Sequence, residues 1–534
     1  MTVTTGRYRR QVPREPGLGA PSLLGGVGSD VAWTYVGVLS VGVASLLVPA
    51  ISLRRLGPTG YGLYALVAAA SSFIIPLDVG LSFGVSRAAA REATTEPGPA
   101  RDVERARVVA SHSLYAVAAG AVLVLTAMAW LTVRVGLVGG TSSRGSVSAL
   151  VGFLGLNTAV VLGTSAYNGL LLGTRRFRTA GGGAVLGSAL TCAALPWSTH
   201  AMSVAGIGFA VLLGSVGARS FVVHQARRVT PWMVFQRPAW HNARLREVAA
   251  VALPMIVVGI GSQIVATTDV FIISIMGSSA SVGLYRAASL IPSQIIYLVF
   301  RGYDACFPAL AQERDEARQE AATRTLTRIA SVAGGVALGG VAWLSPELIK
   351  LLTGRSSDLG VDVLRIFAAV WCVNAAAHGL ALVLIVRLQH KIFTPLVLGE
   401  SVVNVVASVV LVRIMGPVGA AWGTLATIAV SNLLLLPLLT RKHLVESSFA
   451  LVLGNGLLFA CLGVAVARLV VWLVSTLGFA GTARLGLAAV GLVLAGAALA
   501  AVSIGREGRM LMYGAMGSKG AREAQPVPPE VYAS

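Results

Sequence analysis

The stretch AWTYVGVLSVGVASLLVPAISL, residues 32–53, decides the fold of this chain. It runs for 22 residues without a charged side chain, and a bilayer core about 30 Å thick needs about 20 apolar helical residues for one crossing. Comparable apolar stretches follow one another as far as Ile504, separated by short loops. The pattern predicts an all-α polytopic membrane protein with about 14 transmembrane helices.

The expected spans fill most of the chain and leave little outside the bilayer. They lie near residues 32–53, 61–86, 108–133, 147–172, 180–197, 204–223, 248–277, 282–307, 326–345, 361–386, 394–413, 418–440, 451–474 and 484–504.

The composition excludes a sizeable soluble domain. Hydrophobic residues make up 55% of the 534 residues and charged residues only 12%, about half the charged fraction of a soluble domain. The net charge of +20 is spread over many short loops, so we expect no nucleic-acid partner. The four cysteines lie in or at the ends of apolar stretches and the seven histidines are scattered, so we expect no metal site and no cofactor.

The basic residues orient the chain in the membrane. With both termini in the cytoplasm, the cytoplasmic segments hold 29 of the 42 Lys and Arg, the outer segments hold nine, and four lie within spans. Lys and Arg collect in cytoplasmic loops, so we expect a multi-pass protein of the cell membrane with both termini inside. The first thirty residues contain no apolar run suited to a signal peptide.

An internal repeat divides the chain. Gly62-Leu63-Tyr64 follows the first span, and Gly283-Leu284-Tyr285 follows the seventh. Gly206-Ile207-Gly208 and Gly419-Ala420-Ala421 repeat at a similar offset. A repeat of six spans keeps its orientation in the membrane, so the halves should be related by a pseudo-two-fold axis along the membrane normal, an arrangement of many transporters.

The repeat predicts two six-helix bundles followed by two further helices. The expected parts are a disordered cytoplasmic tail (1–30), an N-terminal bundle (31–224), a cytoplasmic linker (225–247), a C-terminal bundle (248–440), two additional transmembrane helices (451–504) and a second cytoplasmic tail (505–534).

Several motifs resemble those of one family. The sequence from Leu56 to Tyr64 (LGPTGYGLY), the sequence Leu77-Asp78-Val79-Gly80-Leu81 with Arg87, and the sequence opened by Gly416-Pro417-Val418-Gly419 are similar to bacterial oligosaccharide flippases. These belong to the multidrug/oligosaccharidyl-lipid/polysaccharide (MOP) exporter superfamily. The resemblance covers roughly residues 30–505.

The resemblance implies a function by analogy. It implies a V-shaped pair of bundles that work by alternating access and carry a polyprenyl-pyrophosphate-linked oligosaccharide from the inner to the outer leaflet for surface polysaccharide biosynthesis. The implied partners are membrane lipid, this lipid-linked substrate, a polysaccharide polymerase and glycosyltransferases. Lipid II flippases and multidrug antiporters share the superfamily.

Such a cargo requires cationic side chains inside the membrane. A pyrophosphate in hydrocarbon is very costly, and Arg binds phosphate oxygens with two parallel hydrogen bonds. The candidates for a cationic cavity are Arg219, Arg286, Arg301 and Arg87. For Arg87 and Arg301, a side chain that reaches the lipid headgroups is at least as good an explanation.

Three acidic residues within the spans are candidates for ion coupling: Asp269, Asp78 and Glu400. A buried acid is costly unless it is paired or protonated. The sequence Ala266-Thr267-Thr268-Asp269 places small polar groups beside one carboxylate. The alternatives are a cap or an ion pair with Arg87 for Asp78, and a pair with a basic residue for Glu400.

Two other function classes compete. A glycan polymerase or glycosyltransferase needs a catalytic acid, base or metal, but the longest outer segments offer only Asp358 and Glu347 and no His. We therefore expect no enzyme. A multidrug or cation antiporter would need a more acidic and aromatic cavity, whereas four arginines lie within the spans.

Overall fold

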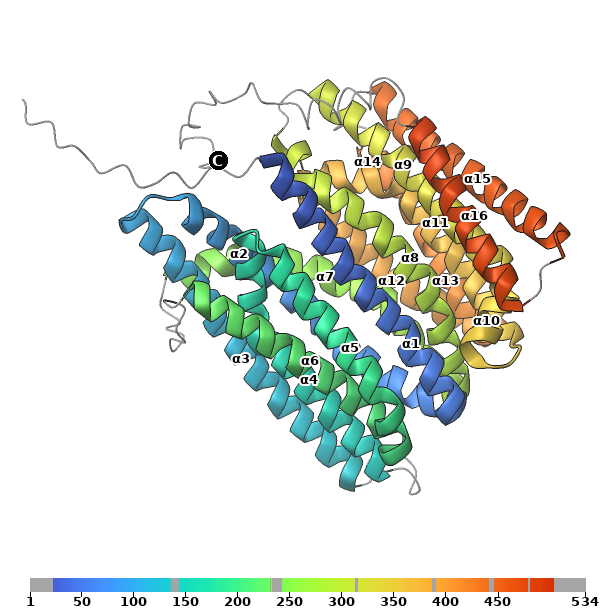
Figure 1. Ribbon diagram of the computed structural model, residues 1–534, viewed down its shortest axis with the longest axis horizontal. Coiled ribbons are helices and arrows are strands. Elements are labelled where there is room, and N and C mark those ends of the chain that lie inside the picture. The colour runs from blue at the N-terminus through green and yellow to red at the C-terminus, as the bar shows by residue number, and fades with distance from the viewer. Residues whose placement is uncertain are drawn as a thin grey trace, which may run out of the picture.

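The computed structural model describes residues 23–135, 144–230, 232, 243–312, 316–386, 390–440, 446–478 and 481–503. Within these ranges the chain forms helices and no strand. Most of the long helices run side by side in one slanted bundle (Figure 1). The all-α fold is thereby confirmed.

The first half of the chain forms one group of packed helices, in which α3 contacts α4, α4 contacts α6, and α5 contacts both α1 and α6. Its members are α1 (Leu23–Ser72), α2 (Ile75–Thr94), α3 (Pro99–Val135), α4 (Arg144–Gly173), α5 (Phe177–Met202) and α6 (Val204–Val229).

The second half forms a second group, in which α7 contacts α12, and α11 contacts α8, α9 and α13. Its members are α7 (Ala243–Met276), α8 (Ser279–Gln312), α9 (Glu316–Trp343), α10 (Ser345–Thr353), α11 (Asp358–Val386), α12 (His390–Met415), α13 (Val418–Val430), a π-helical turn (Ser431–Leu435) and α14 (Leu436–Thr440).

The last two helices, α15 (Glu446–Thr476) and α16 (Gly481–Ser503), pack against α9 of the second group. They lie at one edge of the molecule, away from the first group (Figure 1). Their position agrees with the prediction that they lie outside the repeat.

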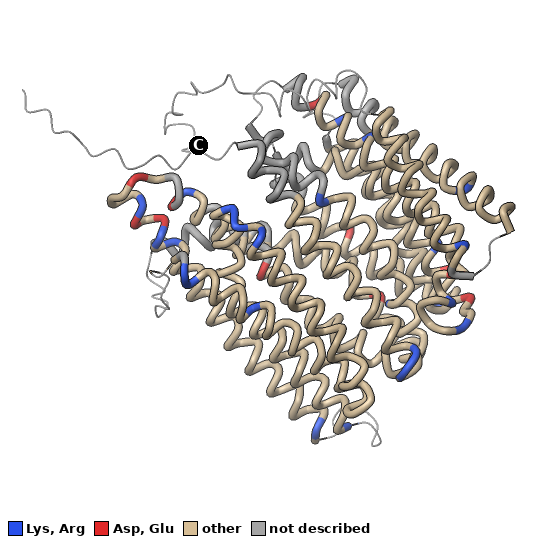
Figure 2. The backbone as a smooth tube through the Cα atoms, viewed as in Figure 1, with Lys and Arg blue, Asp and Glu red and all other residues tan. Residues whose placement is uncertain are grey.

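Thirteen helical stretches of the described chain are long and apolar enough to cross a membrane. The first of them, Ala32–Asp78, has 47 residues and contains Gly57, whose φ of 71° breaks the helix. This stretch therefore comprises the first expected span and most of the second, and the thirteen stretches account for fourteen crossings. Charged residues lie mostly near the helix ends, and the parts of the helices between are largely uncharged (Figure 2).

Two predicted boundaries were wrong. Helix α1 begins at Leu23, inside the predicted tail, because Leu23, Leu24 and Val27 continue the apolar pattern. The linker is shorter than residues 225–247, because α6 continues to Val229 and α7 starts at Ala243. Residues 1–22 and 505–534 of the predicted tails lie outside the described residues.

The repeated motifs occupy matching places in the two halves. A side chain on Gly62 would overlap the carbonyl oxygen of Ser279, and one on Gly283 would overlap that of Pro58. The two equivalent glycines thus face each other where α1 meets α8, as equivalent residues do across a two-fold axis. Small residues let transmembrane backbones approach this closely.

A second pair of equivalent glycines shows the same relation. Gly206 lies against the Ser198 carbonyl where α5 turns into α6, and Gly419 lies against the Leu411 carbonyl where α12 turns into α13. A side chain on either glycine would overlap that oxygen. The repeat read from the sequence is therefore a structural repeat.

Candidate binding cavity

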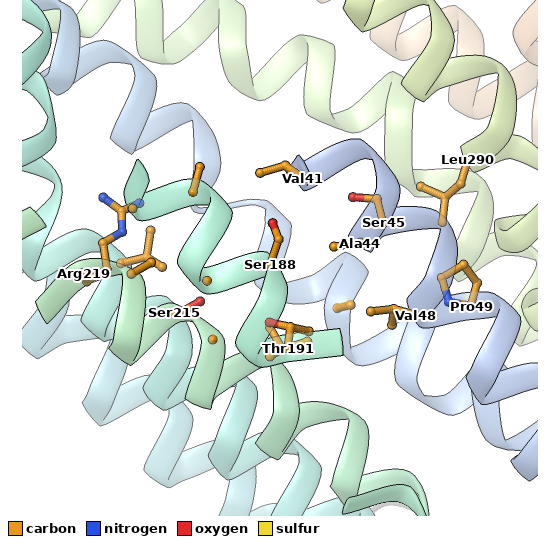
Figure 3. Close-up of a pocket in the computed structure, with 18 of the residues that line it drawn as sticks. Val41, Ala44, Ser45, Val48, Pro49, Ser188, Thr191, Ser215, Arg219 and Leu290 are labelled. Carbon is orange, nitrogen blue, oxygen red and sulfur yellow. The ribbon is translucent and has the colours of Figure 1, made fainter. Parts of the chain in front are cut away.

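A cavity of about 510 Å³ lies between α1 and the helices α4, α5 and α6. Two residues of α8, Arg286 and Leu290, contribute to its wall from the second half of the chain. Figure 3 shows Arg219 at one end of the cavity and Pro49 with Leu290 at the other. The space thus belongs mainly to the first bundle and is completed by one helix of the second.

Small residues create this space. Gly183, Gly187 and Gly214 line it, together with several alanines. Gly214 also lets α6 pack tightly on α5, because a side chain there would overlap that of Thr191. The absence of bulky side chains on these faces leaves room for a ligand and keeps the helices in contact.

The wall combines hydroxyl and amide groups with apolar surface. Ser188, Thr191 and Ser215 lie along it between the two ends (Figure 3). Asn168 and Tyr64 are further polar residues of the wall. Such a mixture can accept hydrogen bonds from sugar hydroxyls and can also donate them.

The two strongest arginine candidates line this one cavity. Arg219 comes from α6 and Arg286 from α8, so residues from both halves of the chain contribute a positive charge. Tyr61 and Tyr64 line the same cavity as Arg286. No Asp or Glu is present among the described residues that line the cavity.

The other two arginine candidates are not part of this wall. Arg301 lies on α8 with an exposed side chain, about 22 Å along the helix from Arg286 at 1.5 Å per residue. Arg87 lies on α2, and its side chain is outside the described residues, as is its predicted ion pair with Asp78. The sequence predicts how far along a helix each arginine lies, but it does not predict the direction in which the side chain points.

Asp78 lies in a second, smaller cavity of about 220 Å³. This cavity shares Tyr64, Ala68, Val161 and Val211 with the larger one, so the two spaces are adjacent. The hydroxyl of Tyr115 donates a hydrogen bond of 2.8 Å to the main-chain oxygen of Asp78. The carboxylate also interacts electrostatically with Arg219.

Asp269 is buried in the second bundle and is hydrogen-bonded through both oxygens. Ser408 donates to Oδ1 at 2.8 Å, while Tyr285 and Thr424 donate to Oδ2 at 2.5 and 2.9 Å. Its side chain thereby ties together α7, α8, α12 and α13.

The sequence places the small polar residues of its own segment beside the Asp269 carboxylate, and for Thr267 this expectation was wrong. The hydroxyl of Thr267 donates to the main-chain oxygen of Gln263 at 2.7 Å. The carboxylate instead takes its donors from three other helices. Neighbouring residues on a helix point about 100° apart, so adjacency in sequence did not place these groups together.

Glu400 accepts a hydrogen bond of 2.8 Å from Ser431, the first residue of the π-helical turn. No ion pair to a basic residue is present for Glu400 among the described residues. It lies on α12 and does not line the 510 Å³ cavity.

Sequence reasoning missed the polar residues of the cavity wall. Tyr61 and Tyr64 belong to the LGPTGYGLY motif, but the motif alone does not show that they line a cavity. The hydroxyls of Ser188, Thr191 and Ser215 gave no signal, because Ser and Thr are common in transmembrane helices and usually bond to their own backbone.

Comparisons with known proteins agree with this architecture. A family model described as "Polysaccharide biosynthesis protein" matches residues 27–314. No curated protein matches the chain in sequence. Solved structures match at low identity and therefore bear on the fold.

Three solved structures illustrate this fold. An inward-facing multidrug resistance MATE family transporter of the MOP superfamily has a TM-score of 0.64 at 17% identity. The matched region covers 75% of this chain and 94% of the transporter's chain. The lipid II flippase MurJ in an inward closed conformation has a TM-score of 0.62 at 11% identity, with coverages of 91% and 99%. A MOP superfamily transporter from Pyrococcus furiosus has a TM-score of 0.58 at 17% identity, with coverages of 80% and 96%.

The family model spans more than half of the chain, and the helices adopt the fold of MATE and MurJ transporters. The predicted resemblance to the MOP exporter superfamily is confirmed. The chain is a multi-pass membrane protein that belongs to the polysaccharide biosynthesis protein family.

Proposed function

We propose that this protein is a flippase that carries a polyprenyl-pyrophosphate-linked oligosaccharide from the inner to the outer leaflet of the cell membrane, for surface polysaccharide biosynthesis. The observation that carries the proposal is that Arg219 and Arg286 both line one cavity. Two guanidinium groups lower the cost of bringing a pyrophosphate into the membrane. The hydroxyl-rich wall suits the sugars that follow it.

The same cavity argues against a cation as the cargo. A multidrug antiporter that binds cationic drugs requires negative charge, and the described lining residues include no carboxylate. The likeness to a multidrug transporter at 17% identity bears on the fold alone. The charge of the lining therefore favours an anionic cargo.

Surface glycan in cells tests the proposal. Arg219→Ala and Arg286→Ala should each lower the amount of surface polysaccharide at unchanged protein level, and the double variant should lower it further. A charge-assisted hydrogen bond contributes about 1.5–3 kcal/mol, so each truncation should slow translocation by about tenfold or more.

The matched control is Arg413→Ala, because Arg413 is exposed at the end of α12 and does not line the cavity. This variant should keep wild-type glycan. Wild-type glycan in both single variants and in the double variant would refute the cationic cavity.

We also propose Asp269 as a coupling residue for a proton or sodium gradient. Its carboxylate, the hydroxyls of Ser408 and Thr424 and the amide of Asn404 form one buried oxygen-rich cluster. The Oδ1 atom of Asn404 is buried and has no hydrogen-bond partner among the described residues. Oxygen donors of this kind suit hard cations.

Asp269→Asn keeps the size of the side chain and removes its charge. Translocation of lipid-linked glycan by this variant in vesicles should lose its dependence on an imposed proton or sodium gradient. Gradient dependence equal to that of the wild type would rule out this role for Asp269.

A further inference from the structure

A groove of about 350 Å³ lies against α15, one of the two helices outside the repeat. Its lining comes from α9, α11 and α15, and among the described residues it consists of apolar side chains, two cysteines and one charged residue, Arg468. None of these residues lines the 510 Å³ cavity. The groove is therefore a separate space with its own charge.

Helices α9 and α15 run in register beside this groove. A Cβ on Gly339 would lie 2.9 Å from the Cα of Val464. Four residues further along each helix, the guanidinium of Arg468 lies over the ring of Trp343, 4.3 Å from its centre. Helix α9 ends at Trp343, so Arg468 lies at the level where that helix ends.

This level has the side chains of a membrane interface. Trp collects where hydrocarbon meets the headgroups, and Arg extends its charge to the same depth. The Trp343 side chain is 41% exposed. From Arg468 back to Leu457, the groove follows α15 for about 16 Å at 1.5 Å per residue, about half of a 30 Å hydrocarbon core. The groove therefore runs from the interface into one leaflet.

The Arg468 guanidinium has no ion-pair or hydrogen-bond partner among the described residues, and its contact there is with the Trp343 ring. An aromatic face attracts the cation but supplies no oxygen acceptor, so the N–H groups of the guanidinium remain available. A cation exposed at the edge of the hydrocarbon is stabilised by an anion. A phosphate group suits Arg, because it accepts two parallel hydrogen bonds.

The groove beyond Arg468 is suited to a hydrocarbon chain. Ala460 and Ala465 line it, and their small side chains leave the space open. Cys461 and Ala465 are exposed, so the groove opens at the surface of the helix bundle, where lipid chains lie. A phosphate at one end of a hydrocarbon chain is the chemistry of a phospholipid. The unpaired positive charge selects an anionic one, because a zwitterionic headgroup brings its own cation.

We infer that this groove binds one anionic phospholipid, with an acyl chain along α15 and the phosphate on Arg468. The lipid contacts α11 of the second bundle and α15 outside it, and therefore helps to hold the two additional helices in place. The site is distinct from the cavity proposed for the cargo, which shares no lining residue with it.

The first experiment counts bound lipid. Native mass spectrometry of the full-length protein in detergent follows binding of phosphatidylglycerol and of phosphatidylcholine. The wild type should prefer phosphatidylglycerol. Arg468→Gln should weaken its binding by about tenfold or more, because the charge-assisted hydrogen bonds are lost, and should leave phosphatidylcholine unaffected. Arg413→Gln, at an exposed arginine of α12, is the matched control and should bind as the wild type does.

The second experiment tests the groove itself. Ala465→Phe puts a ring where the acyl chain should lie and keeps Arg468, whereas Ala497→Phe alters an exposed alanine of α16 that does not line the groove. Thermal unfolding is measured in phosphatidylcholine nanodiscs with and without phosphatidylglycerol. The anionic lipid should raise the midpoint of the wild type and of Ala497→Phe, because a ligand of the folded state stabilises it. That rise should be lost in Ala465→Phe and in Arg468→Gln.

Three results would overturn the site. The first is equal phosphatidylglycerol binding by the wild type, Arg468→Gln and Ala465→Phe. The second is displacement of the lipid by inorganic phosphate, which would show a site for the free anion. The third is binding of a polyprenyl phosphate in place of phosphatidylglycerol, lost in Arg468→Gln, which would assign the groove to the tail of an isoprenoid lipid. The difference between midpoints with and without the anionic lipid separates lost binding from lost packing.

Discussion

At the scale of single residues, the molecule depends on a few positions where only glycine fits. Gly62 and Gly283 face each other at the contact between α1 and α8, and each lies against a main-chain oxygen of the opposite helix. Because the obstructing atoms are backbone rather than flexible side chains, a side chain cannot be accommodated without moving one of the helices. The two halves can thus approach this closely because Gly62 and Gly283 each have a hydrogen atom in place of a side chain.

Gly62→Ala should therefore lower the thermal stability of the purified protein, by about 1–3 kcal/mol, the usual cost of overpacking. The matched control is Gly84→Ala on α2, where a Cβ would have no heavy atom within 4 Å. This control should be neutral or stabilising by up to about 1 kcal/mol. Equal unfolding midpoints for the two variants would contradict the close contact.

The candidate site could be predicted in part at this scale. The position of Arg219 and Arg286 along their helices followed from counting residues, and these two were favoured over Arg87 and Arg301. That both side chains reach one cavity depends on the rotation of α6 and α8 about their axes, which a single sequence does not report. The partners of Asp269 show the same limit, because Ser408 and Thr424 lie 139 and 155 residues away.

At the scale of elements, α2 and α3 are joined by an ion-pair network at one end of the first bundle. The buried carboxylate of Glu92 accepts from Nε of Arg101 at 2.8 Å and from Nε of Arg105 at 2.9 Å. The Arg105 guanidinium also lies over the ring of Trp232, 5.3 Å from its centre. This network attaches a described residue of the linker between the halves to the first bundle.

Glu92→Gln should loosen this hairpin. It leaves two arginines without their shared carboxylate, and we expect a loss of about 1–2 kcal/mol, because the arginine side chains are 29% and 35% exposed and so partly screened by water. Thermal unfolding measures this loss, and Glu96→Gln, at an exposed position, is the control. Identical midpoints for the two variants at low salt would show that the network contributes nothing.

The helices themselves were largely predictable, because an apolar run of bilayer length has few alternatives to a transmembrane helix. The breaks within them were not. The turn at Phe73 and Ile74 divides the second expected span, and Gly57 lies within what otherwise continues as one helix. Pro76 and Gly57 gave a local signal, but Pro49 and Pro196 lie inside helices that continue past them.

At the scale of the whole molecule, the two halves repeat in backbone and differ in charge. Ala65 and Arg286 occupy equivalent places in the motifs that begin with Gly62 and Gly283, and both line the 510 Å³ cavity. Because only the second half has an arginine at this position, the pair of equivalent positions contributes one positive charge to the cavity. The backbone scaffold thus follows the repeat, whereas the charge of the cavity comes from positions at which the two halves differ.

The expected orientation follows from the distribution of basic residues, and reporter fusions test it. Alkaline phosphatase joined after Ser534 should be inactive, because it would remain in the cytoplasm. The same enzyme inserted in the predicted outer segment between residues 134 and 146 should be active. The reverse pattern would invert the topology and with it the proposed direction of transport.

Translocation in proteoliposomes tests the central claim most directly. The purified protein is reconstituted with a fluorescent polyprenyl-pyrophosphate oligosaccharide, and a membrane-impermeant quencher reports the fraction that has changed leaflet. The wild type and Arg413→Ala should translocate this lipid at similar rates, and the double variant Arg219→Ala with Arg286→Ala should do so about a hundredfold more slowly. A double variant as fast as the wild type would show that these guanidinium groups do not carry the cargo.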